Sequence, residues 1–259
     1  MSFRRVVLPP EAFGQGGKIT IRGPAYRHLV RVLRMKPGDL VAVTDGKGAE
    51  CLARLVAVGP GEALAEMVSA RPTLLEPSVE VVLVVGIPKG DKSAMVLQKA
   101  TELGVARFIM VPTRRSVVRL EAAREPRRRE RWQKIVEAAA AQCGRSVVPA
   151  VQTAPSLAAA LAGLARGTFI LMPWEGERVR GLREALDLIR RRPPAGVAVL
   201  VGPEGGWAEE EVETALAAGA VTVSLGPRIL RCETAALVTA ALILYELGDL
   251  GVLGGGGVA

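Results

Sequence analysis

Two segments near the C-terminus decide the fold of this chain: Val201-Gly-Pro-Glu-Gly-Gly-Trp207 and Leu225-Gly-Pro-Arg-Ile-Leu-Arg-Cys-Glu-Thr-Ala-Ala236. Each segment follows a short apolar run and leads into a helical pattern, which predicts a loop at the carboxyl end of a strand. Open α/β sheets bind their ligands at that edge. Because glycine accepts a positive φ and lets backbone approach a ligand closely, both loops are candidates for a binding site.

The residues after the first loop indicate what kind of ligand it holds. Glu209, Glu210 and Glu211 occupy the opening turn of the next predicted helix. Acidic side chains stabilise a helix N-terminus, but they repel a phosphate bound there. The loop also lacks the Lys and Ser/Thr of a P-loop and the G-x-G-x-x-G spacing of a dinucleotide site. A neutral or cationic ligand is therefore favoured over a nucleoside triphosphate.

From residue 79 onward, the chain alternates strand and helix patterns. The pattern predicts strands at 79–87, 107–111, 147–151, 168–171, 197–201 and 221–225, and helices at 93–103, 125–142, 157–165, 182–191, 209–218 and 235–245. Such alternation predicts an α/β fold, with a parallel sheet covered by helices on both faces. The last helix is apolar on every side, so it must be buried within the domain or between subunits.

The first 72 residues have a different pattern. Short strands are predicted at 6–8, 18–21, 40–44 and 49–58, with one or two helical turns around 24–33. Strands this short and frequent predict a small β-barrel. The stretch 70–78 contains two prolines, which indicates a linker. The predicted organisation is a barrel at 1–72, an α/β domain at 79–250 and a flexible Gly-rich tail at 251–259.

Composition limits the possible partners. The 259-residue chain has a net charge of +8 and a pI near 9.9, although its apolar and charged fractions are ordinary. That charge favours a polyanionic partner, without separating RNA from DNA or from an acidic membrane surface. His28 is the single histidine, and Cys51, Cys143 and Cys232 have no C-x-x-C spacing, so no metal site or disulfide framework is predicted.

Neither a signal peptide nor a membrane span is predicted. The N-terminus has no apolar segment, and the most apolar helix candidate is shorter than the roughly 20 residues that a bilayer requires. Together with the cysteine pattern, this favours a soluble protein of the reducing cytoplasm.

The two glycine segments and three others resemble one known family. The others are Arg27-His-Leu-Val-Arg-Val-Leu-Arg34, Lys99-Ala-Thr-Glu-Leu-Gly-Val105 and Glu137-Ala-Ala-Ala-Ala-Gln-Cys-Gly-Arg145. In this order they are similar to the uridine N3-methyltransferases of small-subunit (16S) ribosomal RNA, which belong to the SPOUT superfamily. The resemblance implies S-adenosylmethionine as cofactor, ribosomal RNA as partner and a homodimer. It also implies a SPOUT-type α/β domain with a C-terminal trefoil knot, preceded by a small PUA-like β-barrel that binds RNA.

The same resemblance implies where the cofactor binds. S-adenosylmethionine is expected in a bent form within three loops, which follow the strands ending near residues 171, 201 and 225. A mostly apolar pocket with a few fixed polar groups is the usual form of such a site. The residues expected to bind the cofactor are Leu171, Met172, Pro173, Val201, Gly202, Glu204, Gly205, Gly206, Leu225, Gly226, Ile229, Leu230, Arg231 and Thr234.

Methylation at N3 of uracil requires the loss of an imide proton. Methyl transfer is an in-line displacement, so positioning supplies most of the rate, and a cation beside the uridine anion stabilises it. Arg231 is the first candidate for that cation, and Glu204 and Glu233 are candidate carboxylates for orienting the substrate or accepting the proton. Glu233 equally suits capping of the helix that follows it. The sequence assigns no general base.

Arginines supply the candidate RNA contacts, since guanidinium groups suit phosphates and stacked bases. Arg27, Arg31 and Arg34 recur at helical spacing, which predicts three guanidinium groups on one helical face of the small domain. With aromatic residues at only 3% of the chain, an aromatic stacking platform is not expected. The full predicted set is Arg4, Arg5, Arg22, Arg27, Arg31, Arg34, Arg114, Arg115 and Arg119.

Three other functions compete with a uridine N3-methyltransferase. SPOUT folds also support ribose 2′-O-methylation of ribosomal or transfer RNA, but the similarity of the N-terminal segment favours the base methylase. A non-catalytic RNA-binding ribosome assembly factor is a second alternative, which the intact glycines of both loops disfavour. The third is a dinucleotide-binding oxidoreductase, which the missing fingerprint disfavours.

Overall fold

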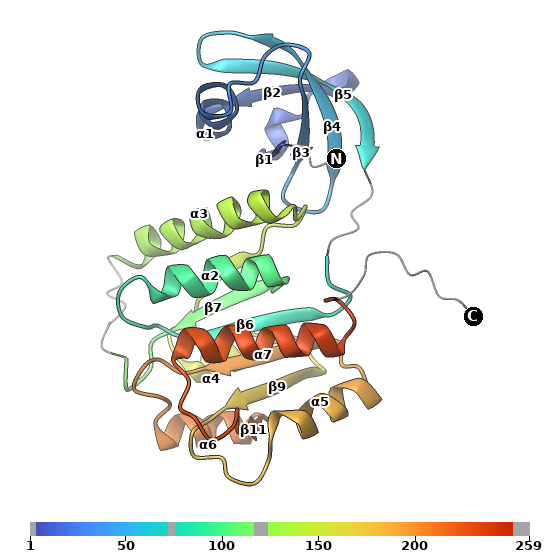
Figure 1. The fold of residues 1–259 in the computed structure, drawn as a ribbon. Helices are drawn as coiled ribbons and strands as arrows, with labels where there is room; N and C mark the ends of the chain where they lie inside the picture. The colour runs from blue at the N-terminus through green and yellow to red at the C-terminus, as the bar shows by residue number, and fades with distance from the viewer. Residues whose placement is uncertain (1–3, 72–75, 117–123, 251–259) are drawn as a thin grey trace, which may run out of the picture. The chain divides into compact units, whose positions relative to one another are not determined.

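The structure is a computed structural model, and it describes residues 4–71, 76–116 and 124–250. The chain forms two compact units, each coloured by its place in the sequence in Figure 1. One unit comprises Met1–Glu76 and Glu137–Val148, and the other comprises Pro77–Val136 and Pro149–Ala259. The predicted tail at 251–259 lies outside the described residues.

The first unit contains a curled five-stranded sheet with the order β1-β3-β4-β5-β2. β1 runs parallel to β3, and the other neighbours are antiparallel. Buried side chains from alternate strand positions, including Ile19, Ile21, Val41 and Leu55, form its core. The strands are β1 (Arg4–Val7), β2 (Lys18–Arg22), β3 (Leu40–Thr44), β4 (Glu50–Val58) and β5 (Glu62–Arg71).

Short helices join the first strands of this unit. The 3₁₀ turns η1 (Pro10–Ala12) and η2 (Gln15–Gly17) precede β2, and α1 (Gly23–Tyr26) continues into a π-helix, η3 (Arg27–Val32). Buried Tyr26 and Leu29 anchor this helical segment to the core. The helix ends before Arg34, whose φ of 52° is left-handed. The three arginines expected on one helical face therefore divide, with Arg34 beyond the helix that carries Arg27 and Arg31.

The second unit is built on a six-stranded sheet with the order β11-β9-β10-β6-β7-β8, in which every pair is parallel. Its central strand β10 is buried along its whole length, and β6 is buried except at its first residue. The parallel sheet predicted from the alternating pattern is thus confirmed. The strands are β6 (Glu80–Gly86), β7 (Arg107–Val111), β8 (Ala150–Thr153), β9 (Thr168–Pro173), β10 (Gly196–Val201) and β11 (Val221–Val223).

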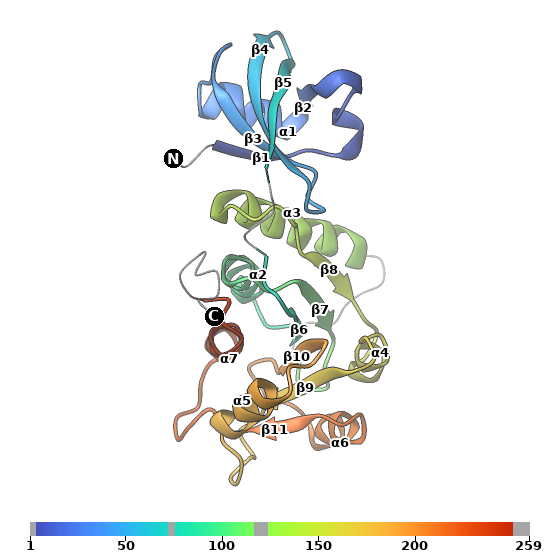
Figure 2. The ribbon, with the colours of Figure 1, turned by 90° about the vertical axis from the view of Figure 1, so that its right-hand side faces the viewer.

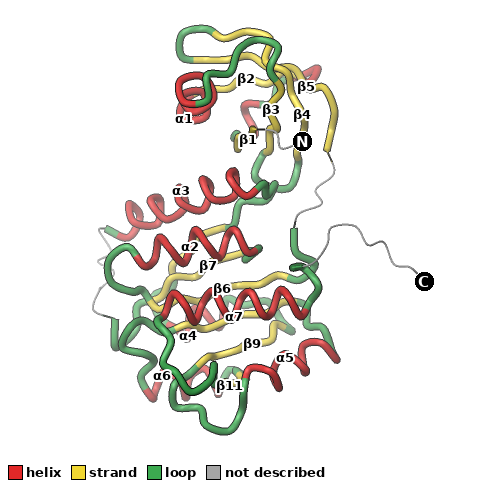
Figure 3. The backbone as a smooth tube through the Cα atoms, viewed as in Figure 1, coloured by secondary structure: helices red, strands yellow, loops and turns green. Residues whose placement is uncertain are grey.

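Helices cover both faces of this sheet, as predicted. α2, α5 and α7 lie on one face, and α4 and α6 lie on the other (Figure 2). α2 ends at Gly104, whose φ of 118° gives the left-handed conformation that a glycine after a helix commonly adopts. Figure 3, coloured by secondary structure, shows the helices of this unit packed around its strands. The helices are α2 (Lys92–Leu103), α3 (Glu125–Cys143), α4 (Leu157–Ala162), α5 (Leu182–Arg191), α6 (Glu209–Ala217) and α7 (Cys232–Glu246).

The C-terminal helix α7 begins at Cys232, earlier than the apolar pattern predicts, because Arg231 already serves as its N-cap. Ala236, Ala240, Ile243 and Leu244 face the sheet and are fully buried. The opposite side is exposed in the single chain, so an apolar composition alone did not bury the whole helix. Among the described residues, no helix has both the length and the apolar character that crossing a membrane requires.

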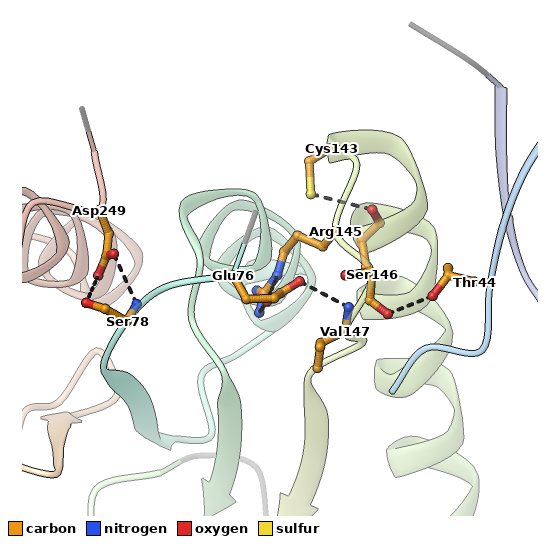
Figure 4. Close-up of polar contacts among 9 residues, drawn as sticks. Thr44, Glu76, Ser78, Cys143, Arg145, Ser146, Val147 and Asp249 are labelled. Atoms are coloured by element: carbon orange, nitrogen blue, oxygen red, sulfur yellow. Dashed lines mark hydrogen bonds and ion pairs between the residues drawn. The ribbon is translucent and has the colours of Figure 1, made fainter. Parts of the chain in front are cut away.

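Residues 144–148 pack with the turn between β3 and β4, which explains their place in the first unit (Figure 4). The hydroxyl of Thr44 donates to the carbonyl of Ser146 at 2.8 Å. Glu76 forms an ion pair with the buried Arg145 at 2.7 Å and accepts a hydrogen bond from the N–H of Val147 at 3.0 Å. These are long-range contacts that no local sequence pattern encodes.

Candidate active site

A pocket of about 1200 Å³ opens at the carboxyl edge of the six-stranded sheet. The loops after β9, β10 and β11 line it, together with the first residues of α7 and with Lys92 at the start of α2. This is the edge at which open α/β sheets bind ligands. The two glycine segments thus lie together on one pocket, although they begin far apart in the sequence, at residues 201 and 225.

Most of the residues expected to bind the cofactor lie on this pocket. Leu171 and Met172 do not, because both are fully buried within β9. Thr234 is exposed in the first turn of α7 and is also absent from the lining. The expected residues that line the pocket are Pro173, Val201, Gly202, Glu204, Gly205, Gly206, Leu225, Gly226, Ile229, Leu230 and Arg231.

Sequence reasoning did not single out the other lining residues. Several belong to the two glycine segments, and those at 174–178 follow β9 directly, so their position after a strand was an available signal. Lys92 begins α2, six residues after the end of β6, so it lies too far from the end of its strand for the same signal to identify it. The additional lining residues are Lys92, Trp174, Glu175, Glu177, Arg178, Pro203, Trp207, Ser224, Pro227, Arg228, Cys232 and Ala235.

The loop after β10 is a tight turn whose shape depends on glycine. The N–H of Gly206 donates to the carbonyl of Pro203 at 2.9 Å, and Gly206 has a φ of 69°, which disfavours other residues. A Cβ on Gly202 would lie 3.1 Å from the carbonyl carbon of Gly206. A Cβ on Gly86, at the end of β6, would lie 2.6 Å from Cδ of Pro203. The loop after β10 therefore packs closely on itself at Gly202 and against the end of β6 at Gly86, which fixes its position.

The carboxylate of Glu204 is paired with the ammonium of Lys92. The Lys92 Nζ lies 2.6 Å from Oε1 of Glu204, and the backbone N–H of Lys89 donates to both carboxylate oxygens at 3.2 and 3.3 Å. Burial opposes ionisation, but these hydrogen bonds outweigh it and hold the pKa of Glu204 below its usual value. Glu204 is therefore an ionised carboxylate at neutral pH and a weak proton acceptor.

Glu233 and Cys232 form a second polar pair at the start of α7. The thiol of Cys232 donates to Oε2 of Glu233 at 3.2 Å, and both residues are buried. Burial and the neighbouring Glu233 raise the pKa of Cys232 to about 12, so the thiol stays protonated. Burial opposes ionisation of Glu233 too, but hydrogen bonds and the charges of Lys92 and Arg231 keep its pKa below the usual value. Arg231 itself is exposed on the pocket.

Glu177 organises the loop after β9. Its carboxylate accepts hydrogen bonds from the hydroxyl of Thr222 at 2.6 Å and from the N–H groups of Val179 and Arg180 at 2.7 and 3.1 Å. These donors favour the ionised form and lower the pKa of Glu177 to about 2. The ionised carboxylate of Glu177 thus links the loop after β9 to β11.

The arginines expected to contact RNA in the first unit have different environments. Arg27, Arg31 and Arg34 are exposed. Arg4 is exposed and donates to the carbonyl of Leu33. Arg5 is largely buried in an ion pair with Glu50 at 2.9 Å, so its guanidinium packs within the unit.

Among the remaining expected arginines, Arg22 pairs with Glu62 at 2.7 Å but stays largely exposed. Arg114 and Arg115 follow β7 and are exposed, and Arg115 donates to the carbonyl of Gly205 at 3.2 Å. Arg119 lies outside the described residues. Within the described part of the chain, no group of three or more His, Cys, Asp or Glu side chains is placed to hold a metal ion.

Comparison with known proteins extends these observations. Residues 75–244 match the family model of the RNA methyltransferase domain, and residues 21–68 match that of the RNA methyltransferase PUA domain. The ribosomal RNA small subunit methyltransferase E of Bacillus subtilis is 33% identical, over 93% of this chain and 95% of the relative. The protein of the same name from Synechocystis is 34% identical, over 94% of this chain and 77% of the relative.

Solved structures give the same result. The ribosomal RNA small subunit methyltransferase E of Neisseria gonorrhoeae, bound to S-adenosylmethionine, is 35% identical with a TM-score of 0.84, and the match covers 93% of this chain and 97% of the neighbour. A Legionella pneumophila protein described as a methyltransferase, in complex with the same cofactor, is 28% identical with a TM-score of 0.79, covering 94% and 97%.

The fold, the loop-built pocket and the two matched family models define the class of this protein, which is that of an RNA methyltransferase with an N-terminal PUA domain. Within that class, the chain belongs to the family of the ribosomal RNA small subunit methyltransferase E.

Proposed function

We propose that this protein methylates N3 of a uridine in small-subunit (16S) ribosomal RNA, with S-adenosylmethionine as the methyl donor. The observation that carries the proposal is the pocket in which the two glycine segments meet, in a chain that resembles its relatives along almost its whole length. The cofactor supplies an electrophilic methyl group when it is bound. The tasks of the protein are to hold the donor, to orient the uracil and to stabilise the charge left on it.

The residues of the pocket suit S-adenosylmethionine. Gly202 and Gly206 allow the loop after β10 to turn tightly, since a Cβ on Gly202 would crowd Gly206 and Trp207 and since Gly206 has a positive φ. The lining carries carboxylates at 175, 177 and 204 and cations at 92, 178, 228 and 231, so it offers partners both to the sulfonium and to the carboxylate of the cofactor. The residues proposed to hold the cofactor are those of the three loops, with Arg231 at the start of α7.

The pocket has room for a second group beside the cofactor. Its volume of about 1200 Å³ exceeds the roughly 300–1,000 Å³ usual for the site of one small ligand. A uracil base entering the same pocket reaches the methyl donor directly, which an in-line displacement requires. We assign Arg231, exposed on the pocket, to contact with the substrate or the cofactor.

The proposal divides the work between the domains at 1–72 and 79–250. The first supplies exposed Arg27, Arg31 and Arg34 for phosphates, and the second supplies the methyl-transfer site. Arg5 is left out of the RNA contacts, because its ion pair with Glu50 occupies it. Because ribosomal RNA is the substrate, we place the protein in the cytoplasm.

The proposal also includes a homodimer and a trefoil knot that involves the segment from Leu225 to α7. Val238, Leu242 and Tyr245 recur at helical spacing on α7, and they are 38%, 40% and 66% exposed. Ile229 on the pocket rim is 92% exposed. Exposed apolar side chains along one helix are typical of an interface, and a second copy of the chain covering α7 would lie beside the pocket.

Nucleoside analysis tests the reaction. Unmodified small ribosomal subunits are incubated with the protein and S-adenosylmethionine, and the RNA is digested and separated by chromatography with mass spectrometry. We expect 3-methyluridine. The appearance of 2′-O-methyluridine would support the ribose methylase instead, and the absence of any methylated product would support an assembly factor.

The site is tested by Gly202→Val. The added side chain would crowd the backbone of Gly206 and the ring of Trp207, which lie 3.1 and 3.3 Å from an ideal Cβ. Calorimetry should then detect no cofactor binding, while circular dichroism stays that of the parent. Unchanged affinity in a folded variant would refute the assignment of this loop.

A further inference from the structure

An ion pair between Lys92 and Glu204 lies in the pocket, and the proposed function gives Lys92 no role. Lys92 follows the connection after β6, whereas Glu204 comes from the loop after β10, and their side chains meet with Nζ 2.6 Å from Oε1. Each side chain is 33% exposed, so the pair is reachable from the pocket that it lines. The second donor to Glu204 is the N–H of Lys89, which lies in the connection just before Lys92.

The position of Lys92 is not explained by the helix that it begins. Lys92 is the first residue of α2, and a cation at a helix N-terminus is electrostatically unfavourable. Asp91, the N-cap residue, makes no capping hydrogen bond with its side chain, which lies 3.4 Å from Arg131 instead. The charge of Lys92 therefore does not stabilise α2, and its side chain forms an ion pair with Glu204 in the pocket.

The surroundings of Lys92 keep it protonated. The hydrogen bond with Glu204 is the largest cause that raises the pKa of Lys92, and the charge of Glu233 at the start of α7 acts in the same direction. The loop after β9 adds Glu175, Glu177 and Arg178 to the wall of the pocket. At neutral pH, Lys92 is thus an ammonium group and not a base. Glu204 accepts hydrogen bonds from Lys92 and Lys89 and is not free to take a proton.

A cation in this pocket can stabilise the anion that forms when uracil loses its N3 proton. N3 lies between two carbonyl groups, so loss of its proton spreads negative charge over both oxygens. A fixed cation within hydrogen-bond distance of one of those oxygens stabilises the anion more than the neutral base, and this difference lowers the barrier. An ammonium fits this task because it donates without accepting.

We propose that Lys92 is a catalytic residue that donates to a carbonyl oxygen beside N3 of the bound uracil, and that Glu204 is the positioning residue that holds it there. The inference rests on the proposed function. The N3 proton leaves to solvent water, and Lys92 stabilises the resulting anion. The N3 electron pair then forms the new N–C bond as the S–C bond of the donor breaks, and the electron pair of the broken bond stays on sulfur.

Four variants test the proposal: Lys92→Met, which removes the charge and keeps the stem, Lys92→Arg, which keeps the charge, Glu204→Gln, and Lys99→Met as the control. Lys99 lies on the same helix and pairs with Glu102 at 2.8 Å, away from the pocket, so its loss changes the net charge equally. Single-turnover methylation of unmodified small ribosomal subunits is measured between pH 6.5 and 9.5. Calorimetry gives the affinity for S-adenosylmethionine, and fluorescence anisotropy gives the affinity for the unmodified RNA.

We expect Lys92→Met to lower the methyl-transfer rate at pH 7 by about 100-fold, as the loss of one donor to a developing oxyanion does. Cofactor and RNA affinities should change by less than about twofold. The deficit should narrow as the pH rises, because hydroxide then removes the imide proton without the help of the cation. Lys92→Arg should recover most of the rate, and Glu204→Gln should lose about tenfold with the same pH trend. Lys99→Met should match the parent.

Several results would overturn the assignment. A Lys92→Met rate within twofold of the parent at pH 7 would do so, as would a deficit that is constant across the pH range, which a structural role predicts. Loss of cofactor affinity with an unchanged rate at saturation would make Lys92 a cofactor contact. A parent product other than 3-methyluridine would refute the proposed function and this role together, whereas the correct product with an unaffected Lys92→Met variant would refute only the role of Lys92.

Discussion

Gly86→Ala tests whether the end of β6 sets the position of the loop after β10. Gly86 is buried, and an added Cβ would lie 2.6 Å from Cδ and 3.0 Å from N of Pro203, with Cγ2 of Thr113 at 2.9 Å. Carbon atoms pack best at about 3.5–4.0 Å, so the methyl group lacks roughly 1 Å of space. Proline cannot rotate its ring away from its own backbone, and the loop itself must move.

The size of the effect follows from that displacement. Overpacking of a well-packed site costs about 1–3 kcal/mol. For a protein of this size, each kcal/mol lowers the melting temperature by about 2–4 °C, so we expect a fall of about 2–12 °C. If the shift of the loop costs the cofactor one or two backbone hydrogen bonds of about 0.5–1.5 kcal/mol each, its affinity falls by about tenfold.

Calorimetry and thermal unfolding measure both quantities. Gly163→Ala is the matched control, since its φ is in the ordinary range and its added Cβ meets only carbonyl oxygens at 3.5 and 3.6 Å, which is normal contact. The control should keep the parent's affinity and stability within about 0.5 kcal/mol. A Gly86→Ala variant with parental stability and cofactor affinity would refute the argument that β6 positions this loop.

Three further predictions concern the rest of the molecule. Glu177→Gln should lower stability to urea at pH 6, and the difference should vanish as the pH falls toward 2, because a carboxylate with a depressed pKa stabilises the fold above its ordinary pKa of about 4.5 and loses that contribution as it protonates. Replacing Arg27, Arg31 and Arg34 together by alanine should lower the slope of log RNA affinity against log salt by about 2 to 3 without changing cofactor affinity; a fall in cofactor affinity with the same slope would mean a structural role. Leu242→Asp should convert the proposed dimer to a monomer in sedimentation at micromolar concentration, and a parent that is already a fully active monomer would refute the dimer.

The sequence predicts the elements of the second unit well because their signals are local. A continuous apolar run such as that at 79–87 is typical of a strand buried on both faces, and β6 lies within it. Gly104 and the acidic turn at 209–211 mark helix ends by chemistry that acts within a few residues. The predicted bounds therefore fall close to the observed ones.

The first unit was harder to predict, and for physical reasons. β5 (Glu62–Arg71) has no alternation strong enough to separate it from a loop, since Leu64, Met67 and Val68 stay exposed while Ala63 and Ala65 are buried. Its pairing with β2 and β4 defines it instead. The arginine spacing at 27, 31 and 34 implied a continuous helix, but the chain forms a π-helix and then turns at Arg34.

The residues that line the pocket could not all be predicted, because the sequence pattern does not give the order of the strands in the sheet. The glycine segments identify the loops after β10 and β11, but the order of the strands decides which other loop lies beside them. β10 pairs with β6 on one side and with β9 on the other, so the loops that follow these three strands meet at one edge of the sheet. That pairing carries Lys92, at the start of α2, to within 2.6 Å of Glu204, although 112 positions separate the two residues. A pattern read along the chain finds Glu204 as a lone carboxylate and suggests a proton acceptor. In the structure Glu204 is instead an ionised partner that holds Lys92 in place. We therefore propose Lys92, which belongs to neither glycine segment, as the catalytic cation.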